Sequence, residues 1–180
     1  NMNLVRIWGG STYAPEHFME RCDELGVLVW QEFPFYAGEY PETKNYWKFV
    51  QLEVTHQIRR MRNHPSLLIW VGNADCEKWL IESGNATNSA DDEKPKGYKL
   101  FNRLIKQLCE DYDPGRPYRL SSPTDGKTPN DLKAGDCHLP HQRLGSFDIL
   151  KSIESPFISQ FGIDSLPGRK AVDFYNPQMD

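Results

Sequence analysis

The chain of 180 residues is 38% hydrophobic and 26% charged, which is typical of a soluble globular domain or of part of a larger one. Its formal net charge of −4, with no basic cluster beyond residues 59–62, argues against a nucleic-acid partner. No apolar run approaches membrane-spanning length, so we expect no membrane partner. The compartment stays open among secreted, periplasmic and lysosomal locations.

Four cysteines are widely spaced, with neither a Cys-x-x-Cys pair nor the spacing of a zinc site. Cys76 and Cys137 each follow an expected strand and could approach one another, but nothing in the sequence establishes a bridge. Asp136 and His138 lie close enough in sequence to suggest metal ligands, yet two ligands on one strand do not make a site. We therefore expect no metal and no cofactor.

Strands and helices alternate from the start of the chain. Residues 3–8 form a short apolar run closed by two glycines, which indicates a strand and a turn. A helix is expected from Pro15, a residue tolerated in a first helical turn, to the stop at Gly26. The buried strand expected over residues 27–30 then ends in the polar pair of Gln31 and Glu32.

The longest helix is expected over residues 42–63. The proline that follows at position 65 disfavours helical backbone just before it. The apolar residues of this helix recur in steps of three and four and form one stripe, which predicts a single face packed on a core. The stripe consists of Trp47, Val50, Val54, Ile58 and Met61.

The strand expected over residues 67–71 is followed by the most informative polar residues of the chain. It is an unbroken apolar run after Pro65, which is typical of a strand buried on both faces. An amide and two carboxylates follow it directly, on Asn73, Asp75 and Glu77. A parallel α/β barrel presents its chemistry in this way, at the carboxyl ends of its strands. A core strand followed by an ordinary polar loop is the plainer alternative.

The second half of the chain continues the alternation. Its expected elements are a mobile loop over 84–96, a helix over 100–112, a strand over 117–120, a loop over 124–132, a weak strand over 134–139, a short amphipathic element over 147–151 and a last strand over 156–162. Strands that alternate with helices predict right-handed βαβ units and a parallel sheet. About six strands are expected, whereas a closed (β/α)8 barrel needs eight strands and about 250 residues.

The fold class is therefore expected to be α/β, as an incomplete (β/α)8 TIM barrel. An open doubly wound sheet is the alternative, but no glycine-rich phosphate loop follows any strand, and the glycine pair at 9–10 is too weak a signal.

Several longer motifs carry a resemblance to a known family. They are residues 1–10 (NMNLVRIWGG), 22–33 (CDELGVLVWQEF), 62–66 (RNHPS), 70–73 (WVGN), 116–118 (RPY) with 121–123 (SSP), 135–138 (GDCH) and 157–162 (FISQFG). In this order they resemble the catalytic barrel of β-mannosidases in glycoside hydrolase family 2. The resemblance implies that residues 1–180 are barrel strands two to seven of a larger multidomain glycosidase. The family's β-sandwich domains, which would be the barrel's partners, are not present here.

The resemblance also implies a retaining β-glycosidase, which works with two carboxylates on opposite sides of the scissile bond. In that family a glutamate after strand four is the general acid/base, and a glutamate on strand seven is the nucleophile. The matching positions hold Asp75 and Gln160. Aspartate is one methylene shorter than glutamate, and a misplacement of about 1 Å can cost about 10²-fold in rate. A neutral glutamine cannot form the glycosyl ester, so we expect the site to bind better than it cleaves.

The substrate-binding positions implied by the resemblance are Arg6, Trp8, Glu32, Asn73 and His138. Glu77 is a possible alternative acid, and Asp136 and Glu32 are carboxylates at the barrel rim, but each is on the wrong strand or offset from the family geometry. The partner implied is a carbohydrate, a β-mannoside or related β-glycoside, and the function is its hydrolysis at a low rate or not at all. A non-catalytic carbohydrate-binding or structural barrel that has lost hydrolysis is the alternative.

Overall fold

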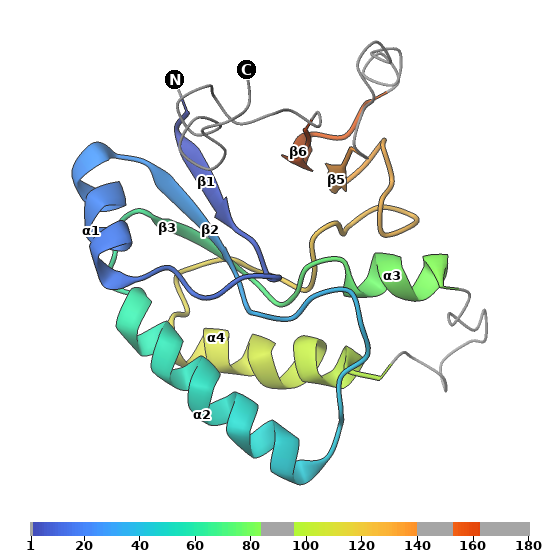
Figure 1. Cartoon of the computed structure of the whole chain (residues 1–180), viewed down its shortest axis with the longest axis horizontal. Helices are drawn as coiled ribbons and strands as arrows, with labels where there is room; N and C mark the ends of the chain where they lie inside the picture. The colour runs from blue at the N-terminus through green and yellow to red at the C-terminus, as the bar shows by residue number, and fades with distance from the viewer. Residues whose placement is uncertain (1, 84–95, 140–152, 163–180) are drawn as a thin grey trace, which may run out of the picture.

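The computed structural model describes residues 2–83, 96–139 and 153–162 (Figure 1). Two expected features, the amphipathic element over 147–151 and the loop over 84–96 apart from its last residue, lie outside the described residues. The described ranges contain no helix that is both long enough and apolar enough to cross a bilayer.

The first four strands form one parallel sheet. They are β1 (Leu4–Ile7), β2 (Leu28–Glu32), β3 (Leu67–Val71) and β4 (Tyr118–Arg119), and they lie side by side in this order. A second parallel pair consists of β5 (Asp136–His138) and β6 (Phe157–Gln160). Parallel neighbours run in one direction, so the carboxyl ends of β1 to β4 lie along one edge of the sheet. The α/β class with parallel sheets is confirmed.

Helices connect the strands. The three that the sequence predicted are present, with one departure in helix type, and a further short helix over 76–82 was not predicted. The helices are α1 (Glu16–Leu25), α2 (Lys44–Met61), α3 (Cys76–Glu82), the π-helical η1 (Leu100–Ile105) and α4 (Lys106–Tyr112). α1 ends at Gly26, whose φ of +67° is a left-handed conformation that glycine adopts without strain. α2 begins after Thr43, whose hydroxyl accepts a hydrogen bond from the Tyr46 N–H. The departure is η1, because the spacing of apolar residues predicts helix there but not the wider π turn.

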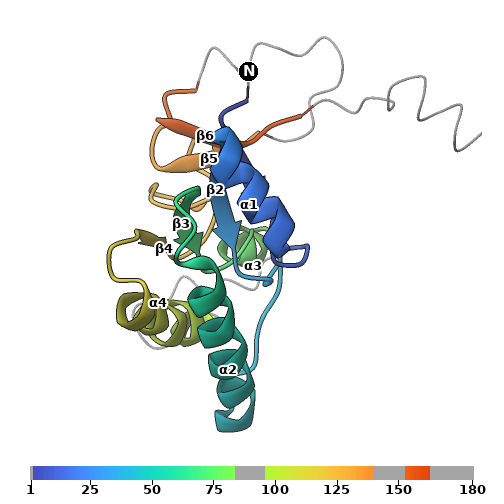
Figure 2. The ribbon, with the colours of Figure 1, turned by 90° about the vertical axis from the view of Figure 1, so that its left-hand side faces the viewer.

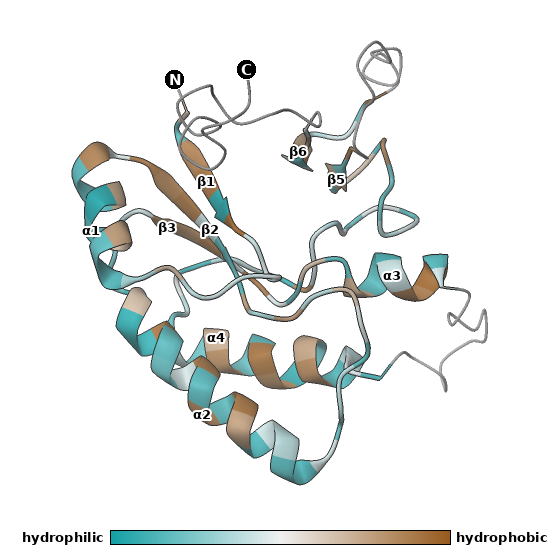
Figure 3. Cartoon of the chain, viewed as in Figure 1, coloured by the Kyte–Doolittle hydropathy of each residue, from teal (hydrophilic) through white to brown (hydrophobic). Residues whose placement is uncertain are grey.

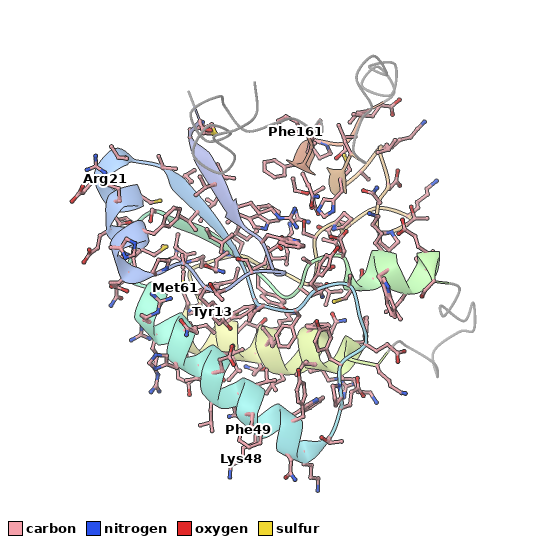
Figure 4. All side chains as sticks on the ribbon, in the orientation of Figure 1. Tyr13, Arg21, Lys48, Phe49, Met61 and Phe161 are labelled. Atoms are coloured by element: carbon pink, nitrogen blue, oxygen red, sulfur yellow. The ribbon has the colours of Figure 1, made fainter. Side chains whose placement is uncertain are left out.

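The main hydrophobic core lies between the sheet and the helices. In both views α2 and α4 lie on one side of the sheet, and β5 and β6 lie on the other (Figures 1 and 2). The predicted stripe on α2 is confirmed: Val50, Val54, Ile58 and Met61 are buried, and Trp47 packs half-buried beside them. Figure 3 shows this division, since the strands are mostly apolar and the helices carry both apolar and polar faces. In Figure 4 Met61 lies at the inner end of α2, while Lys48 and Phe49 project outward.

The opposite face of the sheet carries a smaller apolar cluster. Trp30, Ile69 and Val71 are buried there, and Leu4 packs against them. Trp30 also stacks on Phe157 of β6, with ring centroids 5.4 Å apart and nearly parallel planes. The β5–β6 pair therefore packs over the face of the sheet that lies away from α2 and α4.

The described strands do not close into a barrel, because the sheet order ends at β4 and the β5–β6 pair stands apart. An isolated antiparallel bridge between Thr124 and Asp136 joins the segment after β4 to β5. All four cysteines are buried and free, so Cys76 and Cys137 do not form the bridge that the sequence left open.

Candidate active site

Most of the predicted site residues lie at the carboxyl ends of strands: Glu32 ends β2, Asn73 and Asp75 follow β3, His138 ends β5 and Gln160 ends β6. Gly72 makes the turn after β3 possible. A Cβ at that position would overlap the Tyr118 hydroxyl and the Leu120 carbonyl, so only glycine lets β4 approach this closely. The carboxyl ends of the two sheets therefore hold carboxylates, amides and an imidazole.

Asp75 occupies a special backbone position. It precedes α3 with a left-handed φ of +57°, which is uncommon for a residue other than glycine. Its N–H donates to the Ser122 carbonyl at 2.8 Å, which ties the turn after β3 to the segment after β4. Its carboxylate Oδ1 lies 3.0 Å from His138 Nδ1 and 3.6 Å from Lys78 Nζ. The carboxyl group is thus fixed between two basic groups.

These contacts determine the charge of Asp75. Burial acts to raise the pKa of its carboxyl, but hydrogen bonding to His138 and the positive charges nearby outweigh burial. The pKa of Asp75 therefore lies below its ordinary value, and the carboxyl is ionised at neutral pH.

Arg6 connects β1 to the ends of β2 and β6. Its Nη1 donates to Gln160 Oε1 at 2.9 Å, and its Nε donates to Glu32 Oε1 at 2.6 Å. Because Arg6 takes the amide oxygen of Gln160, the group that Gln160 can offer a ligand is its NH2. Position 160 thus presents a hydrogen-bond donor to a ligand.

Glu32 is held almost entirely inside the protein, at 1% exposure. Besides Arg6 it accepts the Gly9 N–H at 2.8 Å and the indole N–H of Trp30 at 3.0 Å. Burial raises the pKa of the Glu32 carboxyl above its ordinary value, although the Arg6 guanidinium acts in the opposite direction. These contacts give Glu32 the geometry of an internal anchor for Arg6.

A pocket of about 290 Å³ brings three of the predicted residues together, namely Asp75, His138 and Gln160. Lys78 and Trp79 of α3 line the same pocket, as do Tyr36, Ala37, Glu82 and Leu139. The acid/base and nucleophile positions of the resemblance therefore face one cavity. Glu77 lines a different and much smaller hollow, beside Gly38 and Leu80, so the structure does not bring it to the Asp75 pocket.

A second pocket of about 480 Å³ lies between β1, β2 and β6 and shares Gln160 with the first. Arg6, Trp8 and Trp30 line it together with residues 157–161. Trp8 is 40% exposed and meets Tyr36 edge-on, with ring centroids 4.6 Å apart. Since Tyr36 lines the first pocket, these two aromatic rings form a wall between the pockets.

Asn73 lies at the expected strand end but is fully buried. Its side-chain nitrogen donates to the Leu120 carbonyl at 3.0 Å. Its side-chain oxygen accepts the Cys76 N–H at 3.1 Å and the Ser121 hydroxyl at 2.8 Å. The amide thus holds the turn between β3 and α3 in place, and any effect on a ligand passes through Asp75.

Sequence reasoning missed a polar network beneath His138. Asp136 is 2% exposed and accepts hydroxyl hydrogens from Ser122 at 2.7 Å and Ser159 at 2.5 Å. Ser122 Oγ also lies 3.1 Å from His138 Nε2. The motif over 121–123 contained one member of the network, but its partners come from two other strands, β5 and β6. Lys78 was also missed, although its spacing of three from Asp75 at a helix start predicts contact.

No group of three or more histidine, cysteine, aspartate and glutamate residues in the described ranges has the geometry of a metal site.

Parallel strands that present carboxylate, amide and imidazole groups at their carboxyl ends are the arrangement on which parallel α/β enzymes build their active sites. No family model matches the chain. It is 33% identical to β-mannosidase B of Aspergillus clavatus over 184 residues, which cover 96% of this chain and 22% of that protein. It is 34% identical to β-mannosidase of Bos taurus over 198 residues, which cover 100% of this chain and 22% of that protein.

The crystal structure of β-D-mannosidase from Dictyoglomus thermophilum superposes with a TM-score of 0.82 at 37% identity, over 96% of this chain and 21% of that one. The chain is therefore homologous to a segment of the β-mannosidases, which confirms the resemblance found in the sequence. It spans about a fifth of the length of these relatives, since the coverage is 22% and 21%.

Proposed function

We propose that this chain is part of the catalytic (β/α)8 barrel of a family 2 β-mannosidase-like glycoside hydrolase. The observation that carries the proposal is the pocket where Asp75, His138 and Gln160 meet. These residues come from the ends of three different strands, β3, β5 and β6, as barrel enzymes assemble their sites. The homology to β-mannosidases supports a hydrolase over the non-catalytic alternative.

Two features support a barrel. The helices α2 and α4 lie on the face of the sheet opposite to Trp30 and its apolar cluster, as the outer ring of a barrel would. The stacked rings of Trp30 and Phe157, and the Arg6–Gln160 hydrogen bond, link β1 and β2 to β6 across the inner face. In a complete barrel the first and last of these strands would be separated by the two strands that we propose the rest of the protein supplies.

The substrate we propose is a β-mannoside or a related β-glycoside, and the β-sandwich domains of the longer protein would flank the barrel. The retaining reaction needs a nucleophilic carboxylate, which the Gln160 amide cannot replace. The aspartate at the acid/base position is also short by one methylene, on the order of 1 Å of reach. Hydrolysis by this protein is therefore weak or absent, while sugar hydroxyls can still bind the Gln160 amide.

Hydrolysis of an aryl β-mannoside by the full-length protein tests the proposal. The variants are Gln160→Glu and Asp75→Glu, singly and together. We expect the Gln160→Glu change to raise kcat by about 10²-fold or more and the double change to raise it further. A parent protein already as fast as the double variant would contradict the assigned roles.

Two further results of the same assay would change the proposal. Loss of residual activity in Glu77→Gln would move the acid to Glu77. A protein that binds the glycoside but stays inactive in every variant would support the non-catalytic barrel.

A further inference from the structure

The contacts around His138 fix where its hydrogens lie. The ring stands between two acceptors, with Nδ1 facing Asp75 Oδ1 at 3.0 Å and Nε2 facing Ser122 Oγ at 3.1 Å. Asp75, His138 and Ser122 have the connectivity of a hydrolytic triad. Ser122 is fully buried, however, so its hydroxyl cannot reach a substrate. The contacts lead instead from Asp75 through His138 and Ser122 to the buried carboxylate of Asp136.

A hydroxyl has one hydrogen, and the Ser122 hydroxyl has three possible acceptors, of which Ser159 Oγ at 3.3 Å is the most distant. Asp136 Oδ2 lies 2.7 Å away, closer than His138 Nε2 at 3.1 Å. Three donors converge on Asp136, namely the two hydroxyls of Ser122 and Ser159 and the Thr124 N–H at 2.9 Å, which suits an ionised carboxylate. Hydrogen bonds to a charged acceptor are the stronger kind, so Ser122 donates to Asp136. His138 Nε2 must then carry a hydrogen and donate it to Ser122.

We propose that His138 is a positioning residue that carries hydrogens on both ring nitrogens and thereby holds Asp75 as a carboxylate. With Nε2 protonated, a contact between Nδ1 and an ionised Asp75 requires a second hydrogen on the ring. The imidazolium also places a positive charge beside buried Asp136, for which no lysine or arginine partner is found in the described ranges. The other charged groups around the pair are Lys78 and Glu82 of α3 and Arg6 of β1.

The consequence concerns the substrate class and rests on the proposed function. A carboxylate held ionised has no proton to give to the leaving oxygen of a glycoside. General acid catalysis, which typically contributes about 10²–10⁴-fold, is then lost for leaving groups that need a proton. The pocket therefore suits β-glycosides of acidic phenols, whose leaving groups depart as anions, over alkyl glycosides and oligosaccharides.

Solid-state NMR of the full-length protein labelled with ¹⁵N-histidine tests the proton positions without any sugar. The His138 signals are those lost in His138→Gln. At neutral pH we expect both ring nitrogens of His138 to be protonated. A single protonated nitrogen, whether Nδ1 or Nε2, would overturn the inference.

A pair of adjacent serines supplies matched variants. Ser122→Ala removes the group that accepts the Nε2 hydrogen, so we expect His138 to become neutral and to hold Asp75 as a carboxylate less strongly. Ser121→Ala is the control, since Ser121 is equally buried but donates to Asn73 and not to this network. Equal spectra from the two variants would show that Ser122 does not set the protonation of His138.

The leaving-group preference is measured separately in full-length Gln160→Glu. We expect a nitrophenyl β-mannoside to react about 10²-fold or more faster, relative to an alkyl β-mannoside, than in Gln160→Glu combined with Ser122→Ala. If neither glycoside is cleaved, the proposed function fails while the NMR result still decides the proton positions. If both react at the same ratio in the two proteins, the inference about substrate class is wrong.

Discussion

Arg6 links the buried carboxylate of Glu32 to the side chain of Gln160 in the pocket. It pairs with buried Glu32 at 2.6 Å and donates to Gln160 at 2.9 Å. Removing the cationic partner of a buried carboxylate is strongly destabilising, typically by about 3–5 kcal/mol. The residue that orients the Gln160 amide is therefore also one that keeps an internal charge tolerable.

Arg6→Met should accordingly lower the free energy of unfolding by about 3–5 kcal/mol at neutral pH, measured by urea denaturation. Burial already raises the pKa of Glu32, so lowering the pH protonates it and the loss should shrink in acid. The double variant Arg6→Met with Glu32→Gln is the control and should recover much of the stability. A loss below about 1 kcal/mol in the single variant would show that Glu32 does not depend on Arg6.

Asp23, His64 and Ser66 form a small polar clamp before the amino end of β3, whereas the pocket lies at the carboxyl ends of the strands. Asp23 accepts the Ser66 N–H at 2.9 Å and lies 2.6 Å from His64 Nδ1, so it ties α1 to the segment before β3. Burial acts to raise the pKa of Asp23, but the hydrogen bonds from Ser66 and His64 outweigh it and leave the pKa below its ordinary value.

A carboxyl whose folded pKa is lowered stabilises the protein above its unfolded pKa, about 3.9, and loses that contribution as the pH falls through the folded value. Asp23→Asn should therefore be less stable than the parent at neutral pH, with the difference closing below about pH 3.9. Thermal melts across this pH range measure it. A difference that stays constant with pH would mean that the clamp acts by packing and not by charge.

At the scale of elements, α2 contributes four buried residues to the main core, namely Val50, Val54, Ile58 and Met61. Ile58 is fully buried on its inner stripe, whereas Leu52 on the same helix is 61% exposed. Ile58→Ala should lower the free energy of unfolding by about 2–5 kcal/mol, because it removes buried methyl groups and leaves a cavity. Leu52→Ala is the matched control and should change it by less than about 0.5 kcal/mol. Equal effects at the two positions would show that α2 does not pack as described.

The elements were largely predictable because their signals are local. Apolar runs bounded by glycine, proline or polar residues marked β1, β2 and β3, and the three-four spacing of α2 marked its buried face. The π-helical turns of η1, just before α4, were not predictable, since they depend on packing and not on the local sequence.

The sequence predicted which residues belong to the site better than it predicted which way their side chains point. The residues after β3 were expected together at the carboxyl end of the strand, yet Asn73 turns inward to Leu120 and Ser121 while Asp75 faces the pocket. Which way each side chain turns is decided by residues about 50 positions away, since these contacts span 47 and 48 residues. The sequence of one strand end contains no record of those distant partners.

At the scale of the whole molecule, the described strands form two open sheets, and β1 and β6 are two of their edge strands. β1 pairs only with β2 and β6 only with β5 within the described ranges, and Phe157 and Phe161 are exposed near the second edge. Unpaired strand edges beside apolar side chains promote association. We expect these 180 residues, produced alone, to be unstable or to dimerise, as light scattering and melting would show. A monodisperse monomer with a cooperative melt above about 50 °C would contradict this.

The central claim is that position 160 faces the sugar from the nucleophile side of a β-mannosidase-like pocket. The most direct test is covalent trapping in full-length Gln160→Glu with an activated 2-fluoro β-mannoside, followed by mass spectrometry of the labelled peptide. We predict a single glycosyl ester on the carboxylate introduced at position 160, and none in the parent protein, because an amide cannot form that ester. A label on Glu32, Asp136 or Glu77 would contradict the assignment of the pocket.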